Sequence, residues 1–490
     1  MAGGFFSLRE GGAVIVISFV VCLGLILMIG LSSVFLSRGT KSDYYLASRD
    51  VSPMFVGLSA VATNNSGYMF IGVMGFTYTV GLSAVWLMVG WIVGDFVASL
   101  FIHRHLRRRS EAENEVTFAG AISSWHGTNF RLLRVLIALI TLAFLGAYAA
   151  AQMSAGGKAL QALLGWPPAT GAIISAVMVA GYCMAGGIRA SIWTDVLQSA
   201  IMIVAMVLLG YIAINAAGGI DASYDKLAAV PGFLDWFPSD LPFGEFWGPA
   251  LFALGWLFAG FSVAGQPHIM VRFMTLDNDD RLAHTRAWYY GFFTLFYGLA
   301  TVVGLMTKIH LPDIGGMDPE LVLPTMAIEL MPPLLVGLML AGIFAATMST
   351  ADSLVLSCSS ALTHDLMPQR MEKPFHLKLV TIMITAFALA IALSGTQSVF
   401  SLVILAWSLL GASFAPLLVL LARDVKLSEP HAIIMVLAGA MTVILWRELG
   451  WQSYIFEGMP GIIAGFAAFG IYRLFAGEYE PAEKVQQDTA

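Results

Sequence analysis

The chain has 490 residues, of which 58% are hydrophobic and only 11% are charged, and its mean hydropathy is +0.80. Soluble domains carry roughly 25% charged residues, so this composition excludes a soluble globular protein and indicates a chain that crosses a lipid bilayer many times. The net charge is −6, and the three cysteines lie in apolar segments without paired spacing, so neither a disulfide framework nor a cysteine metal site is expected.

Apolar stretches of roughly 20 residues recur along the whole chain and predict membrane-spanning helices. Thirteen are expected, near residues 12–36, 53–79, 82–102, 132–163, 169–186, 190–216, 247–273, 283–309, 332–364, 376–394, 398–422, 430–447 and 459–476. The first stretch is too long for a signal-peptide core and is not followed by a small-residue cleavage site, so it is predicted to be a retained helix.

Lysines and arginines are distributed unequally between the connections. One side of the predicted membrane collects 20 of the 25, Arg272 among them, and the other side collects 5. Basic loops remain in the cytoplasm, which predicts an N-terminus outside the cell membrane and a C-terminus inside. The run from His103 to Arg109 is explained by this topology, and no nucleic-acid partner is expected. Asp95 is expected to reach water or this basic run, and His268 is interpreted as a residue of the cytoplasmic edge.

Two of the predicted spans contain residues that interrupt helices. Asn64–Gly67 fall together in the second span, and Gly265–Pro267 fall together in the seventh. Asn, Ser and Gly are poor in helix interiors, and proline removes a backbone donor. Interrupted helices at matching positions of two five-helix units are typical of secondary transporters with inverted repeats. This pattern divides the chain into residues 1–52, a first repeat 53–217, an outer loop 218–246, a second repeat 247–422, and a last pair of helices with a cytoplasmic tail, 423–490.

The ninth span carries hydroxyls on one helical face. Ala346, Ser349, Thr350 and Ser353 follow the spacing i, i+3, i+4 and i+7, with Asp352 at the edge of that face. A carboxylate at membrane depth costs on the order of 3 kcal/mol, which a cation or buried partner must offset. An ion site is therefore favoured, although hydroxyls that only join neighbouring helices remain an alternative.

A second acid stands near the start of the sixth span. Asp195 lies one turn before Gln198. It is interpreted as a further cation ligand close to Asp352 and Ser353. The alternative is a carboxylate that extends to the inner interface.

Three motifs together resemble the sodium:solute symporter family, and among its members the sodium/proline symporters. They are GGIRASIWTDVLQ from Gly186, GQPHIMVRFM from Gly265 and ATMSTADS from Ala346. The resemblance covers nearly the whole chain. It implies an all-α polytopic membrane protein of about thirteen helices with a leucine-transporter-like 5+5 inverted-repeat core. It also implies sodium-driven uptake of a small organic solute by alternating access, with sodium as the coupling ion and no organic cofactor.

The resemblance also assigns residues. Its sodium site implies carbonyl oxygens of Ala62, Asn65 and Ala346 with the hydroxyls of Ser349 and Thr350, a set of oxygen ligands that suits a hard cation. A second cation site, present in some members, implies Asp195, Ser349, Asp352 and Ser353. The solute is expected beside Asn64, Asn65, Ser66, Tyr68, Tyr148, Ala259, Val263 and Gln266.

The chain departs from the proline carriers at two points. They have an aspartate where this chain has Asn64, and a serine where it has Asp352, which suggests that one negative charge has been relocated. Aromatic residues of theirs correspond here to Ala259 and Val263, so a wider, less aromatic pocket is expected. Proline or another small amino acid is the first expectation for the solute. Proton-coupled or sodium-coupled uptake of a small carboxylate such as pantothenate is the alternative, followed by a solute sensor and, last, a membrane-embedded enzyme.

Overall fold

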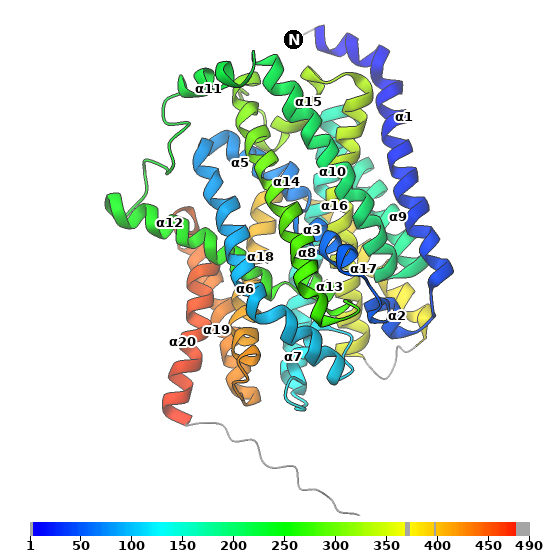
Figure 1. Ribbon diagram of the computed structural model, residues 1–490, viewed down its shortest axis with the longest axis vertical. Helices are drawn as coiled ribbons and strands as arrows, with labels where there is room; N and C mark the ends of the chain where they lie inside the picture. Colours follow the sequence, from blue (N-terminus) through cyan, green and yellow to red (C-terminus); the bar gives the residue numbers. More distant parts are fainter. Residues whose placement is uncertain (1–2, 368–372, 396–397, 477–490) are drawn as a thin grey trace, which may run out of the picture.

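The computed structural model describes residues 3–367, 373–395 and 398–476, which form a bundle of helices (Figure 1). The predicted cytoplasmic tail after Ala476 lies outside these residues. The helices of the first half are α1 (Gly3–Ser32), α2 (Lys41–Leu46), α3 (Pro53–Asn64), α4 (Gly67–Phe70), α5 (Gly72–Val80), α6 (Val85–Ala112), α7 (Phe118–Ser123), α8 (Arg131–Leu164), α9 (Pro168–Gly186), α10 (Ile188–Ala216) and α11 (Ile220–Ala228). Those of the second half are α12 (Gly244–Phe261), α13 (Pro267–Met274), α14 (Leu282–His310), α15 (Val322–Leu330), α16 (Pro333–Ser360), α17 (Pro374–Ser394), α18 (Val399–Ala422), α19 (Glu429–Glu448) and α20 (Gly458–Ala476).

Within the described residues, 12 helical stretches are long and apolar enough to cross a membrane. The prediction of thirteen differs because one stretch, Gly67–Ala112, contains the end of the second predicted span and the whole third one. The chain reverses between them at Gly81, which has a φ of +65° and lies so close to a neighbouring loop that a Cβ would stand 2.1 Å from the Phe233 carbonyl oxygen. Only glycine fits this tight turn.

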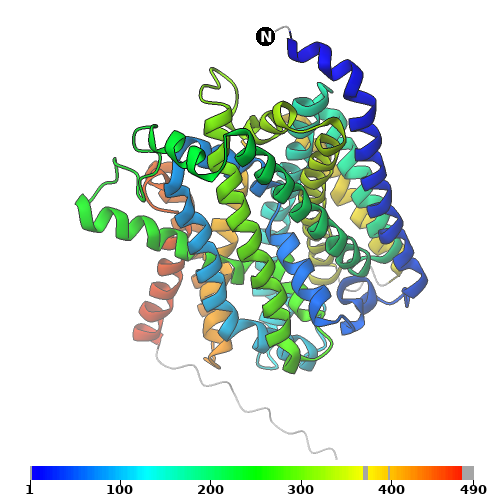
Figure 2. The same cartoon turned by 45° about the horizontal axis from the view of Figure 1, so that its top comes forward.

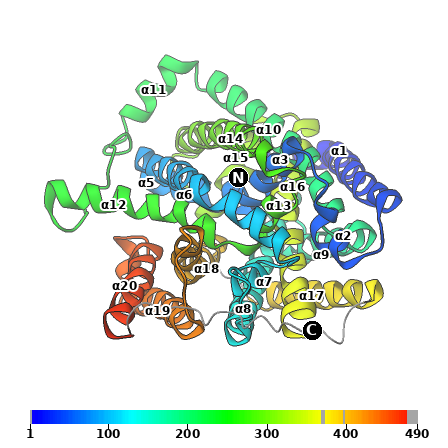
Figure 3. The ribbon, with the colours of Figure 1, turned by 60° about the horizontal axis from the view of Figure 1, so that its bottom comes forward.

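The bundle has a central pair of helices and a periphery. In α16 and α18, 83% of the apolar window is buried, against 28% in α1, α17 and α20. Figure 2 shows α1 along one edge of the bundle, and Figure 3 places α1 and α20 at opposite margins. The hydroxyl-bearing face predicted for α16 is therefore surrounded by other helices. Below, the upper face is the top of the bundle in Figure 1, where α1 begins, and the lower face is the bottom, towards which α1 runs.

Both predicted interruptions are present. Helix α3 ends at Asn64, and α4 begins at Gly67 after the non-helical Asn65 and the extended Ser66. We call this segment the first break. Helix α12 ends at Phe261, passes through a 3₁₀ turn (Ser262–Gly265) and an extended Gln266, and resumes as α13 at Pro267. This is the second break. Proline suits the first position of a helix, where its missing N–H has no partner to lose.

The two broken helices are joined at their lower ends. Val51, which precedes α3, forms a short parallel bridge with Leu276, which follows α13. The Val51 N–H donates to the Thr275 carbonyl at 3.3 Å, and the Asp277 N–H donates to the Val51 carbonyl at 3.0 Å. Helices α3 and α13 therefore meet the lower face as a pair.

Candidate ion and solute site

Four of the five predicted sodium ligands, all but Asn65, lie where α16 crosses the end of α3. The Ser349 hydroxyl lies 3.0 Å from the Ala62 carbonyl oxygen and 3.1 Å from that of Ala346. The Thr350 hydroxyl donates to the Thr63 carbonyl at 2.8 Å. All these residues are buried. Carbonyl and hydroxyl oxygens gathered in this way are the donor set that a hard cation such as sodium prefers.

The first break obtains its hydrogen bonds from side chains. The Gly67 N–H donates to the Gln152 side chain at 2.9 Å, and the Tyr68 N–H donates to the Ser66 hydroxyl at 3.2 Å. That hydroxyl also accepts from the Tyr148 hydroxyl at 3.2 Å. The amide group of Asn65 is buried without any hydrogen-bond partner among the described residues. Backbone that leaves helical geometry at this depth is retained where side chains or a cavity can satisfy it.

The second break is tied to α18. Gln266 donates from Nε2 to the Ser262 carbonyl at 3.1 Å and to the Trp407 carbonyl at 2.9 Å. The Trp407 indole in turn donates to the Ala259 carbonyl at 2.8 Å. Val263 is buried in the same turn. The second break is thus held by hydrogen bonds that side chains donate to backbone carbonyl oxygens.

Aromatic rings pack close to the two breaks, and the expectation of a pocket less aromatic than that of the proline carriers stays a prediction. The ring of Tyr68 lies 5.3 Å from that of Phe400 and 5.9 Å from that of Trp91, and Trp91 lies 4.7 Å from Trp407. Tyr68 belongs to α4 and was expected beside the solute, whereas Trp91 of α6 and Phe400 and Trp407 of α18 were not among the expected residues.

His268 also lies among these rings, contrary to the prediction of an edge position. Its ring centroid is 5.7 Å from that of Tyr148 and 6.4 Å from that of Trp407, and its side chain is fully buried. The first turn of α13 carries it inward.

A cluster of buried charges joins α10, α13 and α16 near the first break. Asp195 and Asp352, predicted to be neighbours, stand on either side of Arg272, whose Nη2 lies 3.4 Å from Asp195 Oδ2 and 3.5 Å from Asp352 Oδ1. All three side chains are 0% exposed. Ser59 donates to Asp195 at 2.6 Å, and Ser191 donates to Asp352 at 2.7 Å. We call Asp195, Asp352 and Arg272 the charge cluster.

Arg272 is the member that the sequence analysis missed, because it was counted with the cytoplasmic basic residues. It also donates to the Ser353 hydroxyl, and that hydroxyl lies 3.0 Å from the Thr63 hydroxyl. The charge cluster is therefore linked by hydrogen bonds to the residues around Ser349. A basic residue on the short helix that follows an interruption is the sequence signal that could have revealed it.

Asp95 does not reach water or the basic run, so that prediction is also wrong. Its side chain is fully buried in α6, and Oδ2 accepts a hydrogen bond of 2.6 Å from the Tyr289 hydroxyl of α14. Tyr289 also accepts a bond of 2.6 Å from the Asn64 amide at the first break. The periodicity of α6 did not indicate this partner, because Tyr289 lies almost two hundred residues away in the sequence.

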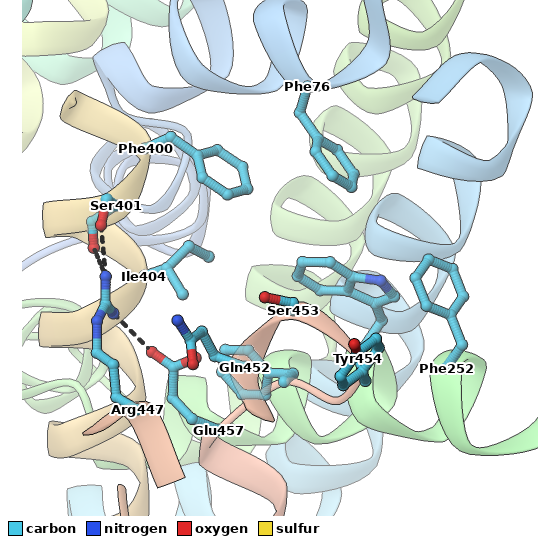
Figure 4. A pocket seen from close by; sticks show the side chains of 12 residues that line it. Phe76, Phe252, Phe400, Ser401, Ile404, Arg447, Gln452, Ser453, Tyr454 and Glu457 are labelled. Carbon is cyan, nitrogen blue, oxygen red and sulfur yellow. Dashed lines mark hydrogen bonds and ion pairs between the residues drawn. The ribbon is translucent and has the colours of Figure 1, made fainter. Parts of the chain in front are cut away.

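A cavity of about 310 Å³ opens between α5, α12, α18 and the segment before α20 (Figure 4). Its lining includes Phe76 and Phe400 on the apolar side, and Trp256 also lines it. On the other side Arg447 pairs with Glu457 at 2.9 Å. Burial raises the pKa of Glu457 above its ordinary value, although Arg447 opposes this effect. Because Phe400 stacks on both Phe76 and Tyr68, one ring separates this cavity from the first break.

Two interrupted helices, with hydroxyl and carbonyl oxygens gathered where α16 crosses the first of them, are typical of a secondary transporter of the membrane. Comparison with known proteins gives the same class and a family. The sodium:solute symporter family model matches residues 44–439. This chain belongs to the sodium:solute symporter family. It is accordingly an integral membrane transporter that couples solute movement to sodium, and not an enzyme.

Individual relatives cover most of the chain. It is 29% identical to the high-affinity proline transporter PutP of Bacillus subtilis over 86% of this chain and 90% of that protein. It is 29% identical to the sodium/proline symporter of Escherichia coli, with 89% of each chain covered. It is 30% identical to sodium/proline symporter 2 of Staphylococcus saprophyticus, with 96% of this chain and 94% of that protein covered.

Solved structures confirm the predicted fold. The chain matches a Na⁺-coupled sialic acid symporter in a substrate-bound outward-open state with a TM-score of 0.81 at 19% identity, covering 96% of this chain and 99% of that one. It matches MhsT in complex with L-phenylalanine with a TM-score of 0.55 at 15% identity, covering 86% and 99%. These likenesses establish the leucine-transporter-like architecture that the family resemblance implied.

Proposed function

We propose that this symporter takes up proline or another small amino acid together with sodium. The observation that carries the proposal is the contact of the Ser349 and Thr350 hydroxyls with the carbonyls of Ala62 and Thr63, beside the first break. The similarity to sodium/proline symporters along most of the chain supports the choice of solute.

Sodium would bind to the carbonyls of Ala62, Asn65 and Ala346 and to the hydroxyls of Ser349 and Thr350. In the structure each hydroxyl donates its hydrogen to a carbonyl oxygen. When the cation enters, both oxygens can turn their lone pairs to it while the hydrogens point away. The ion would then tie α3 to α16 and order the first break. Each ligand would raise the affinity for the other by the same factor, because the coupling is reciprocal.

The solute would lie beside Ser66, Tyr68 and Tyr148, facing Ala259, Val263 and Gln266 across the second break. The Gln266 side-chain oxygen is buried without a hydrogen-bond partner among the described residues, so it can accept from an ammonium group. The unpaired Asn65 amide can donate to a carboxylate. The rings of Trp91 and Trp407 provide apolar surface for a small side chain or a pyrrolidine ring.

A second cation site at Asp195, Ser349, Asp352 and Ser353 follows from charge. Two carboxylates share one guanidinium in the charge cluster, so one negative charge is left over when both acids are ionised. A sodium ion or a proton would neutralise it. Buried charge without compensation is strongly unfavourable.

The lower face is proposed to be cytoplasmic. Helices α1 and α6 run towards this face. Basic residues follow α1, such as Arg38, and occupy the last turns of α6, such as Arg104. Positively charged loops remain inside the cell. The cavity near Arg447 would then open to the outside, as the entry route of the solute.

Uptake into proteoliposomes tests the proposal. Labelled proline is offered with an inward sodium gradient, with an inward proton gradient, and with neither. Uphill uptake driven only by sodium is expected. Uptake driven by protons alone would overturn sodium coupling, and the absence of uptake under all three conditions would overturn proline.

Competition separates the solute classes and the number of ions. Unlabelled small amino acids are expected to reduce proline uptake, whereas pantothenate and short organic acids are not. Competition by the carboxylates alone would establish the alternative solute. Asp352→Asn removes the surplus charge and is expected to reduce the steepness of the sodium dependence from two ions towards one. An unchanged sodium dependence would remove Asp352 from the cation sites.

A further inference from the structure

A chain of three buried side chains ends at the first break. Asp95 of α6 accepts from the Tyr289 hydroxyl of α14 at 2.6 Å, and Tyr289 accepts from Asn64 Nδ2 of α3 at 2.6 Å. Asp95 and Tyr289 are 0% exposed and Asn64 is 4% exposed. Within the part of the chain that the structure describes, none of the three bonds to the charge cluster.

The direction of these bonds follows from the hydrogens available. A tyrosine hydroxyl has a single hydrogen to give. Tyr289 gives that hydrogen to Asp95, so its oxygen can only accept from Asn64. The Asn64 amide must therefore face Tyr289 with its NH₂ group and turn its carbonyl oxygen away. The hydrogen bond from Tyr289 to Asp95 thus fixes the orientation of the Asn64 amide.

The oxygen that is turned away has no partner. Asn64 Oδ1 is buried and accepts no hydrogen bond among the described residues. It belongs to the last residue of α3, directly after Ala62 and Thr63, whose carbonyls meet Ser349 and Thr350. A buried acceptor without a partner is unfavourable, and a cation at the break would satisfy it. Without an acceptor at position 95, the Tyr289 hydrogen could go to Asn64, and the amide would turn its NH₂ group towards the break and oppose a cation.

We propose that Asp95 is a positioning residue that acts through Tyr289 to present the Asn64 side-chain oxygen to a cation at the first break. The cation is sodium or the ammonium group of the solute, and to this extent the inference rests on the proposed function. Asp95 itself touches neither.

Sodium binding to the purified protein is the direct test, because it needs no transported solute. The probe is the shift of the thermal unfolding midpoint as sodium chloride replaces choline chloride, followed by a proline titration at saturating sodium. Asp95→Ala and Tyr289→Phe are expected to raise the half-saturating concentration of one of the two cations about tenfold. Asp95→Asn keeps an acceptor for Tyr289 and is expected to change it less than twofold. A shift of half-saturation in the sodium titration identifies sodium as the cation, and a shift in the proline titration identifies the ammonium group of the solute.

A second background separates positioning from a merely structural role. In Asn64→Asp the two carboxylate oxygens are equivalent, so no orientation has to be fixed. Asp95→Ala is then expected to shift half-saturation less than twofold. The matched control is Asp365→Asn, which alters another buried carboxylate, bonded to Thr117, and is expected to leave both titrations unchanged.

Two results would overturn the inference. One is an unchanged half-saturation for both cations in Asp95→Ala and Tyr289→Phe. The other is the same tenfold shift with Asn64 and with aspartate at that position. A wild-type protein that is not stabilised by sodium would contradict the proposed function itself, and this outcome is distinct from the other two.

Discussion

The two broken helices differ in what holds them. At the first break, hydroxyls of α16 contact backbone carbonyls of α3, and the Asn65 amide and the Asn64 side-chain oxygen have no hydrogen-bond partner among the described residues. At the second break, Gln266 and Trp407 donate to carbonyls of α12 and α18, and the helix that follows carries Arg272 between two carboxylates.

This difference indicates that the two breaks have different roles. Hydroxyls can exchange a carbonyl for a cation at small cost, because a neutral hydrogen bond contributes only about 1 kcal/mol. Removing a guanidinium from between two buried acids costs much more free energy. The first break is therefore suited to binding, and the second is suited to keeping α13 in place.

Arg272→Gln is expected to have the largest effect and to act on stability. It leaves two buried acids without their cation, which costs about 3–5 kcal/mol. The midpoint of thermal unfolding in detergent should fall far below that of the wild type, and adding Asp352→Asn should restore part of the loss. Arg38→Gln, at an exposed pair with Asp50, serves as the control and should change stability by less than about 1 kcal/mol. Equal midpoints for Arg272→Gln and this control would end the distinction between the two breaks.

Ser349→Ala combined with Thr350→Val is expected to act on ion binding instead. Two oxygen ligands are lost, each worth about 1.5 kcal/mol, so half-saturating sodium should rise about a hundredfold. Without sodium, the unfolding midpoint should change little. Sodium-dependent uptake and thermal titration measure both quantities. Ser360→Ala removes a hydroxyl that bonds only within its own helix and should leave sodium dependence unaltered. If the double variant kept the wild-type sodium dependence, the proposed ligands would be wrong.

Trp407→Phe is expected to give the smallest effect. It keeps an aromatic ring but removes the indole hydrogen bond to the Ala259 carbonyl, and the loss of one hydrogen bond costs about 1 kcal/mol. Unfolding should occur at a slightly lower temperature, while half-saturating sodium stays as in the wild type. A marked loss of sodium affinity would show that the second break also takes part in ion binding.

Local sequence signals were sufficient for the elements but not for their partners. The hydroxyl face of α16 follows from helical spacing, and the breaks follow from the residues at 64–67 and 265–267, because both depend on neighbours in the sequence. The contacts of Arg272, Tyr289 and Trp407 could not be predicted from local sequence, because each bonds to a helix far away in the chain. Asp95 was misjudged for the same reason: its distance from the basic run suggested water, whereas packing of α6 against α14 supplied a tyrosine.

The short bridge between Val51 and Leu276 has a mechanical consequence. It joins the start of α3 to the end of α13 by backbone hydrogen bonds. The lower halves of both broken helices should therefore move together as one rigid unit. A pair of spin labels at Ser52 and Asp277 should then report the same separation with and without sodium and solute.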